Sequence, residues 1–96
     1  MRYTDPDTGR VWRVKHEARS DYAIHKKCSP KAFEGGWNRL GTITRWTDGY
    51  HWHDLAGTKS RDTYKTQTAA LQGFIAEMGR RRAANDARKE QQCQKN

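Results

Sequence analysis

The segment Trp46-Thr47-Asp48-Gly49-Tyr50-His51-Trp52 decides the fold. Asp48-Gly49 at its centre is a strong β-hairpin signal, because both residue types tolerate the positive φ angles that a tight turn needs. The sequence therefore predicts a strand over about residues 37–46, with a β-bulge at Gly41, and a returning strand over residues 50–54.

Two alternating segments precede this hairpin. Residues 10–16 place Trp12, Val14 and His16 on one side of a strand, and Arg13 and Lys15 on the other. Residues 21–27 alternate in the same way. Turn-forming residues at 5–9 and 28–36 separate the segments, and a last short strand is expected over about residues 62–65.

The hydrophobic period then changes from that of a strand to that of a helix. Thr66 or Thr68 can cap a helix start, and Gly79 can end it. Apolar residues recur between these points at the spacing of one buried helical face: Ala70, Leu71, Phe74, Ile75 and Met78. Strands followed by one helix predict an α+β fold, with an antiparallel sheet of three to five strands and the helix packed on one face. We assign residues 1–79 to this domain and residues 80–96 to a basic helical extension or a disordered tail.

The composition limits the size of the core. Among 96 residues only ten are Leu, Ile, Val or Phe, which is typical of disordered chains. Ten aromatic residues, all between Tyr3 and Phe74, can supply a thin core instead. No apolar run approaches the roughly 20 residues of a membrane span, and the N-terminus lacks the apolar region of a signal peptide. We expect a cytoplasmic protein, or one of the host cytoplasm if a phage encodes it, with Cys28 and Cys93 reduced.

The charge favours an anionic partner. The chain has a net charge of +8, and residues 80–96 carry half of it. Clustered cations bind nucleic acid by releasing the counterions condensed on its phosphates, although a basic tail can also serve solubility alone. The predicted phosphate contacts in this segment are Arg80, Arg81, Arg82, Arg88 and Lys89.

The histidines suggest two further types of site. His51 and His53 share one face of the predicted strand, but the ligand spacing of a structural zinc site is missing. A nuclease using both histidines and Asp54 is conceivable, yet the chain contains no catalytic motif. We therefore predict a non-enzymatic protein with neither a metal nor a cofactor.

Residues 40–79 resemble a known type of compact β-β-β-α unit. The resemblance rests on Leu40-Gly41-Thr42-Ile43, the segment from Asp48 to Trp52, the segment from Tyr64 to Leu71, and Phe74-Ile75. The segment resembles small proteins of actinobacteria and their phages and, more distantly, the DNA-binding domains of the AP2 and integrase arm types. This resemblance implies that the sheet enters the DNA major groove while the helix braces it from behind. It also implies sheet-side contacts from Arg39 and Arg45.

A protein partner is the alternative to nucleic acid. Alternation cannot place all four tryptophans on one sheet face, so at least one is expected to be exposed, and exposed Trp is typical of binding hot spots. A phage or mobile-element protein could bind and modulate a host protein through Trp37, Trp46 and Trp52. An exposed edge strand would also permit a homodimer.

Overall fold

The computed structural model describes residues 1–27 and 36–94, with side chains as far as residue 85 in the last helix. Five strands form one antiparallel sheet, and one helix follows them, which confirms the α+β prediction. The elements are β1 (Arg2–Thr4), β2 (Val11–Ala18), β3 (Asp21–Lys27), β4 (Trp37–Trp46), β5 (Gly49–Asp54) and α1 (Gln67–Gln94).

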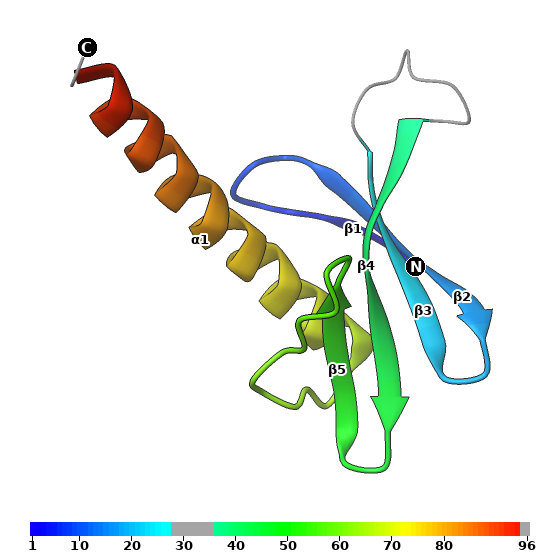
Figure 1. Ribbon diagram of the computed structural model, residues 1–96. Helices are drawn as coiled ribbons and strands as arrows, with labels where there is room; N and C mark the ends of the chain where they lie inside the picture. Colours follow the sequence, from blue (N-terminus) through cyan, green and yellow to red (C-terminus); the bar gives the residue numbers. More distant parts are fainter. Residues whose placement is uncertain (28–35, 95–96) are drawn as a thin grey trace.

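The strands lie in the sheet in chain order, each antiparallel to the next (Figure 1). The predicted hairpin joins β4 to β5, and Gly49 adopts a φ of 134° in its turn. A bulge is also present, one residue before the expected position at Gly41. Ile24 of β3 pairs with Gly41 and the next residue, His25, pairs with Arg39, so Leu40 has no partner on β3.

One predicted strand is absent, and one strand that was not predicted is present. Residues 62–65 form no strand, because Tyr64 makes only one isolated bridge, to Tyr50. The chain instead adds β1 at the opposite edge, where the N-terminal ammonium group donates a hydrogen bond to the Val14 carbonyl at 3.0 Å. The turn before β2 is ordered by Asp5, whose carboxylate accepts hydrogen bonds from the Asp7 amide and the Thr8 hydroxyl. Because bridges from residues 59 and 64 partly cover β5, any strand addition would have to use β1.

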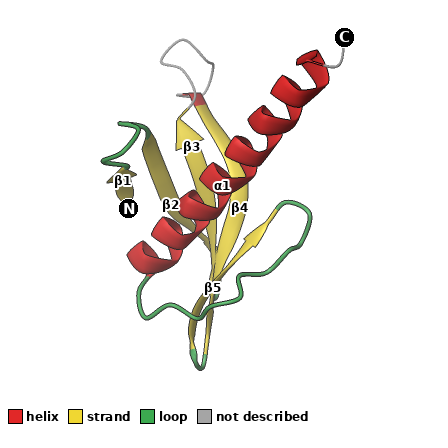
Figure 2. Cartoon of the chain, turned by 90° about the vertical axis from the view of Figure 1, so that its left-hand side faces the viewer, coloured by secondary structure: helices red, strands yellow, loops and turns green. Residues whose placement is uncertain are grey.

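The helix begins where the sequence predicts but passes through its expected end. The Thr66 hydroxyl accepts a hydrogen bond from the Ala69 amide at 3.1 Å, as an N-cap does. Gly79 stays helical, and α1 continues to residue 94. Figure 2 shows α1 crossing one face of the sheet diagonally, with its C-terminal end projecting beyond the strands. Cys28 lies outside the described residues, as does the side chain of Cys93.

Aromatic rings supply much of the core between the sheet and α1. Phe74 is fully buried, and its ring meets Trp12 at 6.2 Å and Trp52 at 5.5 Å, edge-on in both cases. Such edge-to-face pairs contribute about 0.5–1.5 kcal/mol each beyond the burial of apolar area. His16, expected beside Trp12 and Val14, is exposed near the end of β2, where its Nε2 donates a hydrogen bond to the Arg19 carbonyl oxygen at 2.9 Å.

Within residues 1–27 and 36–94, no helix combines the length and the apolar character that a membrane crossing requires.

Two glycines give opposite predictions for the same substitution. A Cβ on Gly41 would overlap the His53 carbonyl oxygen and lie 2.9 Å from the Phe74 ring, whereas a Cβ on Gly79 would meet nothing within 4 Å. We expect Gly41→Ala to lower the free energy of unfolding by about 1–3 kcal/mol or more, as overpacking does. Gly79→Ala should raise it by about 1 kcal/mol, because alanine favours a helix interior. Urea unfolding measures both, and a destabilised Gly79→Ala variant would contradict a helix that continues through this position.

Candidate nucleic-acid interface

The sheet has one face covered by α1 and one face over which no helix or strand of the described chain lies, which we call the open face. At its β5 end, Lys59 and Thr63 contact Trp46 and His51. Trp12, Val14, Ile24, Ile43 and Trp52 belong to the buried core, so their neighbours along each strand point to the open face. The cross-strand register identifies the side chains that share it: Arg2, Arg13, Lys15, His25, Lys27, Trp37, Arg39, Thr42, Thr44, His51 and His53.

Two arginines of the open face share one tryptophan. Arg2 of β1 lies directly opposite Arg13 of β2. The Arg13 guanidinium carbon lies 4.5 Å from the centroid of the Trp37 ring, and that of Arg2 lies 5.7 Å from it. Like charges directly opposite one another destabilise a sheet, whereas the cation–π contacts offset part of this cost. The Arg13 Nε is buried and has no hydrogen-bond partner among the described residues.

Arg39 is held on the open face by one side chain of β2 and one of its own strand, β4. Its guanidinium donates to the Glu17 carboxylate of β2 and to the Thr42 hydroxyl of its own strand, the latter at 3.1 Å. Asp21, the other acid beside this face, accepts a hydrogen bond from Thr44 at 3.0 Å. The cationic side chains of the open face therefore outnumber these two acids, and the face is positively charged.

The positive charges of the open face contribute to a lowered pKa of His25. Burial lowers the pKa from its usual 6.5, and the charges of Arg13 and Arg39 lower it further, while Glu17 acts in the opposite direction. The pKa of His53 is lowered as well, first by burial and then by Lys59. Both imidazoles are therefore neutral at neutral pH and can donate or accept hydrogen bonds there.

The His51 side chain contacts other residues of the β4–β5 hairpin. It is 5 % exposed, its Nε2 lies 3.3 Å from an Asp48 carboxylate oxygen, and its ring packs edge-on against Trp46 at 5.3 Å. The hydrogen bond to His51 lowers the pKa of Asp48. Although His51 and His53 share a face as expected, no group of three His, Cys, Asp or Glu residues that could hold a metal ion occurs in the described part of the chain.

The helical arginines predicted from the sequence differ in their surroundings. Arg80 pairs with Glu77, and Arg81 pairs with Glu77 and, at 2.8 Å, with the nearly buried Asp54 carboxylate. The hydrogen bond with Asp54 is the main reason that the pKa of Arg81 is raised. Arg82 is exposed and forms no ion pair with any described side chain. The side chains of Arg88 and Lys89 lie outside the described residues.

The two arginines predicted on the sheet do not lie together. Arg39 lies on the open face, opposite His25. Arg45 pairs with Tyr50 and follows Ile43 by two residues, so strand alternation places it on the helix side of the sheet, near the hairpin tip. One nucleic-acid surface on the open face therefore includes Arg39 but not Arg45.

The three tryptophans proposed for protein binding do not form one surface. Trp52 is 6 % exposed and packs in the core, so its assignment to a binding surface was wrong. Trp37 lies under Arg2 and Arg13, and Trp46 is 49 % exposed with the Lys59 ammonium 4.1 Å from its ring centroid. The alternation of Arg13 and Lys15 against Trp12 is the sequence signal that indicates the open face, whereas the cluster of charge in residues 80–96 favours the helix as the cationic site.

Comparison of the chain with protein-family models, with curated proteins and with solved structures finds no match.

The lowered histidine pKa values predict a pH-dependent stability. Between the folded-state pKa and 6.5, the unfolded chain binds more protons at His25 and His53 than the folded chain does. Stability from these groups is therefore fully present above about pH 6.5 and is lost as the pH falls below it. We expect the melting temperature to fall between about pH 7.5 and pH 5.5. The fall should be smaller in a His25→Gln/His53→Gln variant, and an equal fall in both proteins would contradict the assignment.

Proposed function

We propose that this protein is a non-enzymatic accessory protein that binds nucleic acid through the open face of its sheet. The observation that carries the proposal is the set of cations on the open face, from Arg2 and Arg13 on β1 and β2 to Arg39 on β4, for which Glu17 and Asp21 are the counter-charges among the described residues. Such a set of cations is matched to a polyanion and is more than solubility requires.

The Arg2–Arg13 pair supports a phosphate ligand in particular. The two guanidinium groups are opposite one another on adjacent strands and share the Trp37 ring, with no carboxylate paired to either in the described chain. A phosphate placed between them would remove their mutual repulsion and accept charge-assisted hydrogen bonds. The free energy that repulsion costs the unbound protein would then be recovered on binding.

Neutral polar groups accompany the cations and would meet base edges or sugars. Thr42, Thr44 and His25 lie beside Arg39 on the same face, and hydroxyl and imidazole groups can donate to or accept from bases. This arrangement fits a sheet laid into the major groove with α1 bracing the opposite side, as the resemblance to AP2 and integrase arm-type domains implies.

The projecting end of α1 would add a second, non-specific contact. α1 extends to residue 94, beyond the sheet (Figure 2), and the sequence of its projecting part contains Arg88 and Lys89. Arg80 and Arg81 are already paired with acids, so we assign them a smaller share of phosphate binding than the open face.

Arg13→Gln tests the open face directly. We expect it to weaken binding to a short random-sequence DNA duplex and to lower the slope of log affinity against log salt by about 1, because one phosphate contact is lost. Fluorescence anisotropy over a range of salt concentrations measures both quantities.

Arg61→Gln is the matched control. Arg61 is exposed and lines a groove beside Gly73 and Glu77 of α1, on the helix side of the sheet. The Arg61→Gln substitution should change the affinity for the duplex by less than about twofold, because Arg61 contacts no proposed phosphate. The proposal fails if wild-type protein does not bind the duplex at low salt, or if Arg13→Gln and Arg61→Gln bind it equally well.

A further inference from the structure

Trp46 is a half-exposed tryptophan at the hairpin end of the sheet. It is the last residue of β4 and follows Thr44 by two positions, so strand alternation places it on the open face. Its side chain is 49 % exposed, whereas tryptophan is highly buried on average in folded proteins. Its cross-strand partner is Gly49, which has no side chain to cover the ring. The indole is therefore accessible to a ligand.

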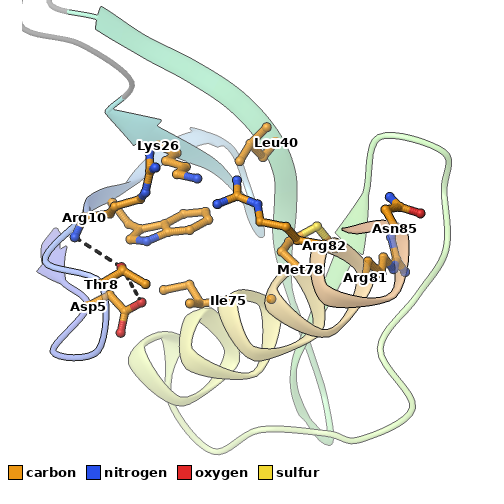
Figure 3. A pocket seen from close by; sticks show the side chains of 12 residues that line it. Asp5, Thr8, Arg10, Lys26, Leu40, Ile75, Met78, Arg81, Arg82 and Asn85 are labelled. Atoms are coloured by element: carbon orange, nitrogen blue, oxygen red, sulfur yellow. Dashed lines mark hydrogen bonds between the residues drawn. The ribbon is translucent and has the colours of Figure 1, made fainter. Parts of the chain in front are cut away.

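The other three tryptophans do not offer a ring face in this way. Trp52 belongs to the core. Trp12 lines a groove of about 510 Å³ between the sheet and α1, whose lining also includes Ile75 of the helix (Figure 3), but Trp12 is only 4 % exposed. Trp37 lies on the open face, where two guanidinium groups already contact its ring. Trp46 is therefore the tryptophan best placed to accept a flat ring.

The orientation of the Trp46 ring is fixed by its neighbours. The almost fully buried ring of His51 packs edge-on against it, with 5.3 Å between the ring centroids. The His51 Nε2 lies 3.3 Å from one carboxylate oxygen of Asp48, and the Thr63 hydroxyl donates a hydrogen bond to the other at 3.4 Å. A ring held in this way loses little side-chain freedom when a ligand stacks on it.

A flexible cation accompanies the ring. The Lys59 ammonium lies 4.1 Å from the centroid of the Trp46 ring. An exposed cation–π contact contributes about two- to fivefold to an equilibrium constant, whereas a nucleic-acid base stacked on an aromatic ring contributes about five- to hundredfold to affinity. A base can therefore displace the ammonium from the ring, and the lysine can then pair with a phosphate of the same strand.

The position of Trp46 relative to the cations of the open face indicates which kind of base it would meet. β4 runs from Trp37, beside Arg2 and Arg13, to Trp46, so these two rings are about 30 Å apart at roughly 3.3 Å per residue. A nucleic-acid strand covers that distance in roughly nine nucleotides. A base inside a duplex is stacked between its neighbours and has no free face, so the base at Trp46 would have to be unpaired.

We propose that Trp46 stacks on an unpaired base, so that the protein prefers the place where a duplex continues into a single strand. The duplex would lie over Arg13 and Arg39, and the single strand would reach Trp46 and Lys59. This inference rests on the proposed function, because the cations of the open face hold the duplex. Although exposed tryptophan is also typical of protein contacts, the lysine on the ring and the adjoining cationic face favour a polyanion.

Fluorescence anisotropy with the full-length protein tests this inference. The ligands are a blunt random-sequence DNA duplex, the same duplex with an oligothymidine extension on one strand, and the same duplex with an abasic extension that has the phosphates without the bases. We expect the wild-type protein to bind the thymidine extension at least about fivefold more tightly than the abasic one, because the base stacks on Trp46.

Two substitutions of Trp46 form a matched pair for this measurement. Trp46→Leu keeps an apolar side chain against His51 but has no π-face, so the ratio of the two affinities should fall close to one. Trp46→Phe keeps an aromatic face and should retain most of the preference. Arg61→Gln, on the helix side of the sheet, should leave the ratio at its wild-type value.

The outcomes separate this inference from the proposed function. If the wild-type protein binds none of the three ligands at low salt, the proposed function fails and this inference fails with it. If the blunt duplex binds but the two extensions bind equally well, this inference alone is overturned, and a protein contact becomes the explanation for the exposed ring. A preference for thymidine that persists in Trp46→Leu also overturns it, because the base then lies elsewhere.

Discussion

The contact between Phe74 and the sheet is the constraint on which the rest of the structure depends. The Phe74 ring lies over Gly41, where a side chain would leave it no room, and it meets Trp12 and Trp52 edge-on. Because the chain has so few aliphatic residues, this cluster supplies much of the apolar burial that a domain of this size needs. The bulge at Leu40, next to Gly41, adjusts the direction of β4 at the same place.

A core confined to one side of the sheet determines the character of the other side. The apolar residues of each strand point toward α1, so the alternating positions carry arginine, lysine, threonine and histidine. The core ends near Met78, the last apolar residue of the helical stripe. Beyond it, Arg81 still pairs with Asp54 of β5, and α1 continues to residue 94. The cationic surface of the open face therefore occurs where the core does not extend, and the sequence of the far half of α1 is rich in basic residues as well.

Local signals in the sequence predicted much of this fold, and long-range contacts explain what they missed. Asp48-Gly49, the alternation around Trp12 and the cap at Thr66 act between near neighbours, and all three appear in the structure. β1 exists because its three residues pair with β2, which no local pattern reveals. Gly79 stays helical because its neighbours favour a helix, and Trp52 is buried because Phe74 covers it. The Arg2–Trp37–Arg13 cluster brings together side chains of three strands. Alternation along each strand indicates which face a side chain occupies, but the contact between the three depends on the cross-strand register.

The indole N–H signals of the four tryptophans offer the most direct test of the open face as the nucleic-acid surface. In a nuclear magnetic resonance titration with a short DNA duplex, the account predicts that the signal of Trp37, between Arg2 and Arg13, shifts first and most. The signal of Trp52, enclosed behind the sheet, should stay in place. A titration in which Trp37 does not move while binding occurs would place the nucleic acid elsewhere and contradict the account.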